Sequence, residues 1–161
     1  MCDSHRKHRK HRYFLLKVNG FPKQERIVSQ KLIEELFTSG QSHSLTAFPL
    51  RAVFLNENGN YNENENVKQN EDEKQNENAV KLLLSVPKRR FKHAVDRNRV
   101  KRQLREAFRK HKHLLADVIP DGQSRALAFV WMSDRHMLSA DVEQRVVTLL
   151  KRIGQTITNK Q

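Results

Sequence analysis

The chain has 161 residues, of which 31 are lysine or arginine and 18 are aspartate or glutamate, so its net charge is +13 and its pI is about 10.2. This length fits one domain with tails. A single cysteine excludes an intrachain disulfide framework, and no apolar run approaches the roughly 18 residues that span a bilayer. The basic N-terminus lacks the apolar core of a secretory signal. We therefore expect a small cytoplasmic protein with no membrane association, whose partner is a polyanion, nucleic acid above all.

Charge and composition divide the sequence into regions of different kinds. Residues 1–12 are rich in histidine, lysine and arginine, and we assign residues 1–24 to a basic tail. Residues 56–78 contain 17 Asn, Glu or Gln among 23 residues and carry a net charge of −5. Such a stretch cannot bury enough apolar surface to offset its ordering entropy, so we expect a disordered insertion. A single domain is then expected at 25–155, interrupted by this insertion and followed by a short tail at 156–161.

The first predicted elements are one helix and two strands. Ser29 is a suitable N-cap for a helix that runs to Ser39. Residues 46–55 and 79–87 have the apolar composition of buried strands. Because only the insertion separates them, we expect these strands to pair as a hairpin with an expanded loop, and we expect Pro49 to cause an edge or a bulge in the first.

A basic helix, a strand and a second long helix complete the predicted order. The basic helix extends from about Asp96 to Leu115, and the strand covers residues 125–132. Ser139 or Asp141 is expected to cap the last helix. The core-facing stripe of that helix is Val142, Val146, Leu149, Leu150 and Ile153. This order of elements predicts one mixed sheet covered by helices.

The basic helix has two different faces. Its apolar face, which should pack on the sheet, consists of Val100, Leu104, Ala107 and Phe108. A second arc of similar width holds five cations, Lys101, Arg102, Arg105, Arg109 and Lys112. Most basic helix faces are simply solvated, but residues 88–113 contain twelve Lys or Arg against two acids. We therefore predict that this arc binds the phosphate backbone of a nucleic acid, which would relieve the repulsion among its charges.

Residues 85–108 resemble the signature of the bacterial ribonuclease P protein subunit. That signature is a strand ending in S-V-x-K, a short basic loop with an Ala-Val pair, and then R-N-R, a hydrophobic residue, K-R and a further arginine. Its positions in this sequence are Ser85, Val86, Lys88, Ala94, Val95, Arg97, Asn98, Arg99, Val100, Lys101, Arg102 and Arg105. The order of the elements extends the resemblance over roughly residues 25–155, apart from the insertion.

The resemblance implies a fold and a function that composition alone does not. The fold would be α+β, a small two-layer α/β sandwich similar to the second domain of ribosomal protein S5, with a mixed four-stranded sheet and an unusual left-handed βαβ crossover. The partners would be a large catalytic RNA, with one protein per RNA, and precursor tRNA. The complex would remove the 5′ leader of that tRNA as an endonuclease that uses Mg²⁺. Because the active site would lie on the RNA, the protein alone is expected to hold no catalytic residue and no metal.

Two groups of site residues follow from the resemblance together with the charge of residues 88–113. The RNA-binding group is Lys88, Arg89, Arg90, Lys92, Arg97, Asn98, Arg99, Lys101, Arg102, Arg105 and Arg109. In this group Asn98 would make a specific hydrogen bond or a water-bridged metal contact, unless it is an ordinary helix-start residue. A leader cleft would lie between the first helix and the sheet, lined by Ile33, Phe37, Pro49 and Arg51. The family commonly has an aromatic residue at the position of Ile33, so base stacking is expected to be weaker there, and Phe37 has core packing as its alternative role.

Other interpretations stay open at the level of the sequence. Cys2 and the histidines of residues 5–11 could bind a metal, although their spacing favours a mobile RNA-binding tail. A stand-alone nuclease would need clustered carboxylates, whereas Asp96 and Glu106 stand ten positions apart among arginines. A structural RNA-binding protein of ribosomal type would share the charge but have no effect on leader removal. Trp131 is expected mainly in the core, with contact to RNA as the alternative.

Overall fold

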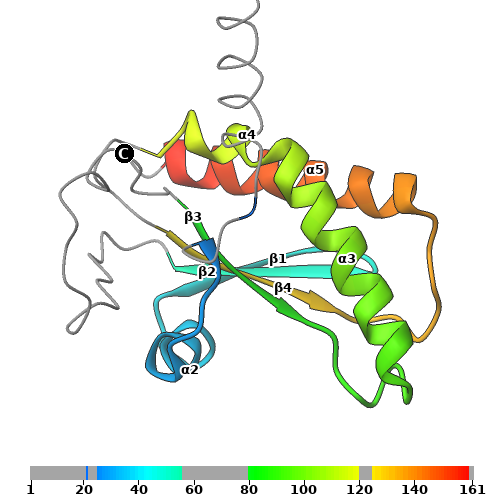
Figure 1. Cartoon of the computed structure of the whole chain (residues 1–161). Helices are drawn as coiled ribbons and strands as arrows, with labels where there is room; N and C mark the ends of the chain where they lie inside the picture. Colours follow the sequence, from blue (N-terminus) through cyan, green and yellow to red (C-terminus); the bar gives the residue numbers. More distant parts are fainter. Residues whose placement is uncertain (1–20, 22–24, 56–79, 120–124, 160–161) are drawn as a thin grey trace, which may run out of the picture.

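The computed structural model describes residues 21, 25–55, 80–119 and 125–159. The basic segment of the N-terminal tail and the Asn- and Glu-rich insertion, with its predicted disorder, lie outside the described residues. The elements in chain order are α2 (Gln30–Thr38), β1 (Ser42–Ala47), β2 (Leu50–Leu55), β3 (Val80–Ser85), α3 (Ala94–His111), α4 (His113–Ala116), β4 (Arg125–Trp131) and α5 (Ser139–Thr158). Figure 1 shows the sheet across the middle of the molecule, with α2 below it and α3, α4 and α5 above it.

The sheet has four strands in the order β1-β2-β4-β3. β1 and β2 pair antiparallel, as do β2 and β4, whereas β3 and β4 run parallel. The predicted mixed four-stranded α+β architecture is therefore confirmed. The predicted hairpin between residues 46–55 and 79–87 is wrong, because β4 lies between β2 and β3. The crossover β3-α3-β4 joins parallel neighbours, and its left-handed sense and the likeness to ribosomal protein S5 stay predictions.

A tight turn at Phe48 and Pro49 divides the first predicted strand into β1 and β2. The Phe48–Pro49 peptide is cis, and Pro49 O accepts a hydrogen bond from Met132 N at 2.9 Å. Pro49 is buried, whereas Phe48 is 65% exposed. The irregularity predicted at Pro49 is thus a reversal of the chain, at which the edge strand β1 ends and β2 enters the interior of the sheet.

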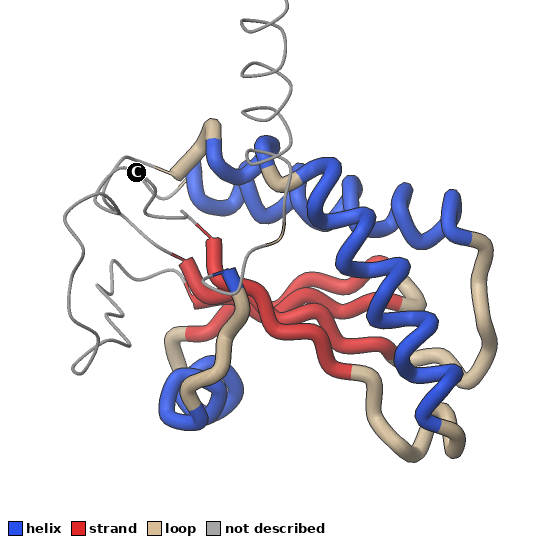
Figure 2. The backbone as a smooth tube through the Cα atoms, viewed as in Figure 1, coloured by secondary structure: helices blue, strands red, loops and turns tan. Residues whose placement is uncertain are grey.

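Successive side chains of a strand point to opposite faces of the sheet, and the apolar ones form two cores, one on each face. The larger core lies between the sheet and helices α3 and α5, and its residues from β2 and β4 are Leu50, Ala52, Phe54, Leu127, Phe129 and Trp131. The smaller core lies under α2, and its strand residues are Val53, Leu55, Ala126 and Ala128. Figure 2 shows the same division, with one helix alone on the lower face. Trp131 is 1% exposed, so its predicted core position is confirmed.

The apolar stripes predicted for the two long helices are confirmed. All four predicted core residues of α3 and all five of α5 are at most 3% exposed. Ser29 caps α2, since its Oγ accepts a hydrogen bond from Leu32 N at 3.4 Å. The predicted cap of the last helix is wrong, because its N-cap is Leu138. Ser139 Oγ instead accepts a hydrogen bond from Gln103 Nε2 at 3.0 Å, which ties the start of α5 to α3.

Three predicted boundaries need correction. The predicted helix 96–115 is two helices, α3 and the short α4. The predicted C-terminal tail, 156–161, begins inside α5, which ends at residue 158. Ile157 is 2% exposed and belongs to the core. Phe21, which the sequence assigned to the tail, packs edge-on against Phe108 with 6.0 Å between ring centroids. No helix within the described ranges has the length and apolar character needed to cross a membrane.

Candidate nucleic-acid interface

The first half of α3 presents a group of polar and cationic side chains. Asn98, Arg99 and Arg102 are exposed, and Lys101 is half-buried. The three exposed side chains line a pocket of about 420 Å³ whose other walls are Val95, Gln103 and Ser139. Among the described residues, no ion pair involves Arg99 or Arg102. Their positive charges are therefore available to an anionic partner.

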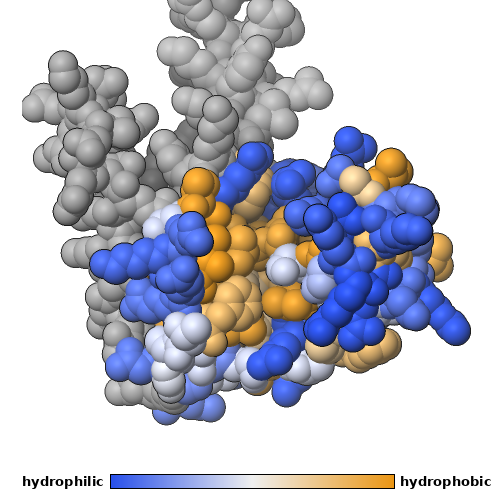
Figure 3. Space-filling model, turned by 90° about the horizontal axis from the view of Figure 1, so that it is seen from below, coloured by the Kyte–Doolittle hydropathy of each residue, from blue (hydrophilic) through white to orange (hydrophobic). Residues whose placement is uncertain are grey.

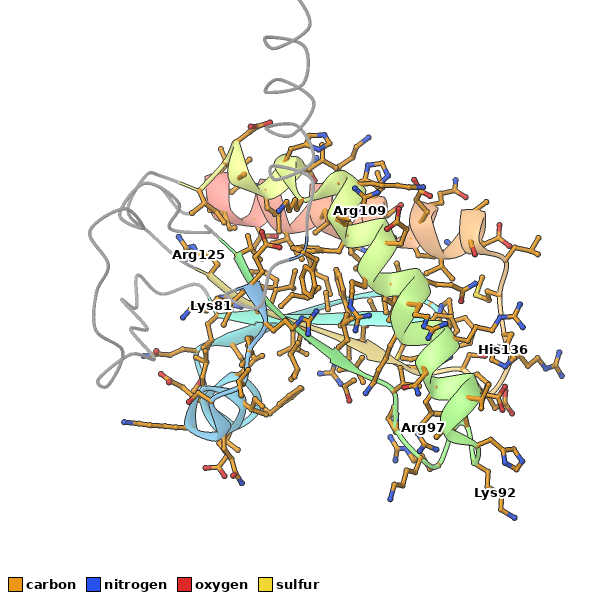
Figure 4. The ribbon with its side chains drawn as sticks, in the orientation of Figure 1. Lys81, Lys92, Arg97, Arg109, Arg125 and His136 are labelled. Atoms are coloured by element: carbon orange, nitrogen blue, oxygen red, sulfur yellow. The ribbon has the colours of Figure 1, made fainter. Side chains whose placement is uncertain are left out.

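A second group of cations lies in the loop between β3 and α3, residues 87–93, here called the basic loop. Arg90 N donates to Pro87 O at 3.0 Å and closes a turn, and Phe91 is 6% exposed in the larger core. Three of its cations are exposed, and they are Lys88, Arg89 and Lys92. Since the loop follows β3 directly, these charges lie at the end of the sheet where α3 begins, as Lys92 does in Figure 4.

Arg97 turns back onto the basic loop rather than outward. Its Nη1 donates to Phe91 O at 2.9 Å and to Lys92 O at 2.8 Å. Figure 4 shows Arg97 at the foot of α3, beside the loop. Of the two arginines in the R-N-R motif, the first thus binds the backbone of the protein itself, and only the second, Arg99, is exposed.

Two cations in the second half of α3 are engaged within the protein. The guanidinium carbon of Arg105 lies 6.0 Å from the centre of the Phe21 ring, in a cation–π contact. Arg109 Nη2 lies 2.6 Å from Glu106 Oε1, and this hydrogen-bonded ion pair lowers the pKa of Glu106 and raises that of Arg109. Two cations of the arc predicted for α3, Arg105 and Arg109, thus have partners within the protein, and the binding of RNA by this arc stays a prediction.

Lys112, which the sequence placed on the same arc, reaches into the protein. Its Nζ lies 2.5 Å from Glu25 Oε1, and the Glu25 side chain is 3% exposed. Burial raises the pKa of Glu25, and the hydrogen bond and charge of Lys112 oppose that rise. This pair fastens the segment before α2 to the end of α3, so Lys112 is not presented to a partner.

Most of the predicted leader-cleft residues lie on the face of the sheet that carries α2. Ile33 is half-buried against the smaller core, and Phe37 is 46% exposed. Arg51 is exposed on the same side of β2 as Val53, and its Nη2 donates to Ser44 Oγ at 3.3 Å. Figure 3 views the molecule from this side and shows a hydrophobic band between two hydrophilic borders. The fold therefore places Arg51 on the sheet face that carries α2, the helix to which Ile33 and Phe37 belong.

Pro49 does not belong to that face. The alternation predicted for residues 46–55 holds only from Leu50 onward, because β2 begins there. Pro49 is buried in the turn before it, with its carbonyl bonded to Met132 N. Its side chain therefore offers no surface to a leader, and its role is to shape the turn.

Three carboxylates of α3 and α5 have basic side chains as partners. Asp96 Oδ1 lies 3.0 Å from His136 Nε2, and Glu106 pairs with Arg109. Glu143 pairs with the side chains of Lys110 and His111. Within the described part of the chain, no three His, Cys, Asp or Glu side chains come together as ligands. These residues therefore do not fit a Mg²⁺ site. The cysteine and histidines of the tail, for which a metal was considered, lie outside the described residues.

Sequence reasoning missed two residues that shape the interface. His136 lies in the loop after β4, and its ring stacks on Phe91 with 4.6 Å between centroids and 19° between planes. Phe21 lies under two guanidinium groups, those of Arg26 and Arg105. Nothing in the spacing of the sequence connects His136 to the basic loop. The one available signal for Phe21 was an aromatic residue just before the predicted domain.

Comparison with known proteins places this chain in one family. The family model described as Ribonuclease P matches residues 21–154. The ribonuclease P protein component of Porphyromonas gingivalis is 33% identical over 139 residues, which cover 86% of this chain and 89% of that protein.

Solved structures agree on the fold. The RNase P protein of Staphylococcus aureus has a TM-score of 0.55 and 18% identity, with 80% of this chain and 94% of that chain covered. The RNase P protein of Thermotoga maritima has a TM-score of 0.54 and 18% identity, with 79% and 96% covered. The chain therefore belongs to the ribonuclease P protein family and is a protein component of ribonuclease P.

Proposed function

We propose that this protein binds the catalytic RNA of ribonuclease P and the 5′ leader of precursor tRNA, and that it thereby assists the endonucleolytic removal of the leader. One observation carries the proposal. Ser85, the last residue of β3, pairs with Val130 of β4, which pairs in turn with Arg51 of β2, so the basic loop leaves the sheet at the end where Arg51 lies.

The catalytic RNA binds at α3 and the basic loop. Arg99 and Arg102 are exposed and take no part in the ion pairs among the described residues, which suits them to phosphate oxygens. Asn98 stands beside them without charge and supplies a hydrogen bond to a base or sugar. Each phosphate that these cations neutralise releases counterions, so the affinity falls as salt rises. The proposed stoichiometry is one protein per RNA.

The leader binds as a single strand on the sheet face beside α2. Phe37 supplies an exposed ring on which a base can stack, and Arg51 supplies a guanidinium group that can stack or contact a phosphate. Ile33 adds apolar contact without an aromatic ring. Hence stacking at this face depends mainly on Phe37.

Catalysis belongs to the RNA in this proposal. In this proposal Mg²⁺ is held by the ribonucleoprotein through its RNA. The protein contributes positive charge between two polyanions, the catalytic RNA and the precursor tRNA. This charge reduces their mutual repulsion, which raises the affinity for the precursor and lowers the Mg²⁺ concentration that cleavage needs.

The test is 5′-leader cleavage of a precursor tRNA at low Mg²⁺, with the matching catalytic RNA alone, with this protein alone and with both. The expected result is strong stimulation only when both are present. Cleavage by the protein alone would make it a nuclease in its own right. Tight, salt-sensitive RNA binding without stimulation would make it a structural RNA-binding protein of ribosomal type.

A further inference from the structure

The basic loop is anchored before any RNA is present. Its turn closes through Arg90 N and Pro87 O, and its phenylalanine, Phe91, is buried in the larger core. Phe91 stands between Arg90 and Lys92 in sequence. The position of its ring therefore sets the direction in which the exposed side chain of Lys92 leaves the protein surface.

Arg97 holds the loop from one side. Its Nη1 carries two hydrogens, and these bond to two successive carbonyl oxygens, Phe91 O at 2.9 Å and Lys92 O at 2.8 Å. Two carbonyls on one guanidinium nitrogen fix the path of the backbone between them. An arginine used in this way has less freedom to follow a phosphate than Arg99, which is exposed on the same helix.

His136 holds the loop from the other side. Its ring lies 4.6 Å from that of Phe91 and is nearly parallel to it, and its Nε2 lies 3.0 Å from Asp96 Oδ1. Asp96 and Arg97 are neighbours on α3, so one turn of the helix supplies both attachments. Phe91 is thereby held between a ring from the loop after β4 and a hydrogen bond from α3 to its carbonyl.

We propose that Arg97 and His136 are positioning residues that hold the basic loop in the conformation that presents its cations to RNA. The proposal rests on the proposed function, because it assumes that the loop contacts the catalytic RNA. A loop that is already ordered avoids the entropy cost of ordering several long side chains and their backbone on binding. In this role Arg97, the first arginine of the R-N-R motif, binds the backbone of the basic loop instead of the RNA.

The first experiment measures loop opening in the free, full-length protein. Trypsin cleaves after Lys88, Arg89, Arg90 and Lys92, and mass spectrometry reports the initial rate at these bonds. We expect Arg97→Ala and His136→Ala to increase this rate about five- to tenfold, because local opening exposes the backbone. Arg99→Ala is the matched control, on the same helix but without a contact to the loop, and we expect its rate to be unchanged beyond the loss of its own cleavage site. Should Arg97→Ala fail to fold, His136→Ala reports on the same loop.

The second experiment separates positioning from phosphate contact through the salt dependence of catalytic-RNA binding. Loss of a phosphate contact lowers the slope of log K against log salt by about 0.7–0.9, and we expect this for Arg99→Ala. For Arg97→Ala and His136→Ala we expect affinity to fall about three- to tenfold at every salt concentration with the slope unchanged. In that case the loop still neutralises the same phosphates but must first be ordered.

The outcomes distinguish this proposal from the proposed function. Wild-type cleavage of the loop in Arg97→Ala, together with a reduced salt slope, would overturn the positioning role and leave RNA binding by α3 intact. Faster loop cleavage with no change in RNA binding would overturn the proposed contact between loop and RNA. Faster cleavage with weaker binding at constant slope supports both.

Discussion

Glu106 and Arg109 form a two-point ion pair on the outer side of α3, with Arg109 Nε 2.9 Å from Oε2 and Nη2 2.6 Å from Oε1. Along the helix the two residues lie about 10 and 15 Å from Arg99, at a rise of about 1.5 Å per residue. It reduces the positive charge of the second half of α3. The charge offered to RNA is therefore concentrated in the first half of the helix and in the basic loop.

Replacing Glu106 with glutamine should strengthen RNA binding. The change removes a negative charge and releases Arg109 from its partner. We expect catalytic-RNA affinity to rise by about two- to fivefold at low salt, the range of an exposed ion pair, and the salt dependence to become steeper. Filter binding at several salt concentrations measures both. Glu34→Gln, at an exposed position on α2, is the control for loss of one negative charge. Equal effects of the two changes would contradict a specific role for the pair.

Replacing Lys112 with alanine should destabilise the protein in a pH-dependent way. Burial raises the pKa of Glu25 above its ordinary value of 4.5, so the folded state binds the proton more tightly than the unfolded state. The contribution of protonated Glu25 to the free energy of unfolding is therefore lost as the pH rises above 4.5. Without Lys112, a buried carboxylate is left unpaired. We expect a loss of about 3 kcal/mol in the free energy of unfolding at pH 7, and a smaller loss near pH 4, where Glu25 is protonated.

Denaturant unfolding at the two pH values checks this prediction. Lys110→Ala is the matched control, because Lys110 is 44% exposed and its partner Glu143 lies at the surface. We expect that control to lose less than about 1 kcal/mol. A loss for Lys112→Ala that is the same at pH 4 and pH 7 would mean that the pairing with Glu25 is not its cause.

Replacing Phe37 with alanine should weaken binding of the leader alone. We expect the complex with the catalytic RNA to lose about 1–2 kcal/mol of affinity for a precursor tRNA, the size of one stacking contact, and none for mature tRNA. The measurement is the ratio of the two dissociation constants. Phe48→Ala removes an even more exposed ring, which lies in the β1–β2 turn, and should leave the ratio unchanged. An equal loss for precursor and mature tRNA would remove Phe37 from the leader site.

Replacing the insertion 56–78 with a short linker should preserve folding and activity. β2 ends at Leu55 and β3 begins at Val80. Because β2 runs antiparallel and β3 parallel to β4, the last residue of β2 and the first residue of β3 lie at the same end of the sheet. They are two strand spacings apart, about 10 Å. About six Gly and Ser residues span this distance easily. Thermal unfolding and precursor cleavage test the variant, and a large loss of either would show that the insertion has a function of its own.

The helices could be predicted because their signals are local. The apolar residues of α3 and α5 recur at helical spacing, and this spacing alone identifies the buried faces. Strand pairing is not local. The sequences on either side of the insertion do not show that β4, which follows α3, will insert between β2 and β3. The chain reversal at Pro49 likewise involves a distant residue, because Met132 N donates a hydrogen bond to the Pro49 carbonyl.

The candidate site was predictable in its charge but not in how each charge is used. The density of cations around Arg99 indicated an RNA-binding surface. The pairing of Glu106 with Arg109 could have been found, since their spacing of three places them on one helix face. The contact of His136 with Asp96 joins residues 40 positions apart, and the hydrogen bonds from Arg97 depend on the conformation of a loop. Both required the three-dimensional structure.

We propose that α3 and the basic loop bind the catalytic RNA and that the sheet face beside α2 binds the leader. The most direct test of this assignment is site-specific photocrosslinking in the assembled complex of protein, catalytic RNA and precursor tRNA. A benzophenone side chain replaces Arg102 in one variant and Phe37 in another, and the two RNAs carry different labels. We expect position 102 to crosslink to the catalytic RNA and position 37 to crosslink to the 5′ leader. Crosslinks from position 37 to the catalytic RNA alone, or from position 102 to the leader alone, would contradict the assignment of these two surfaces.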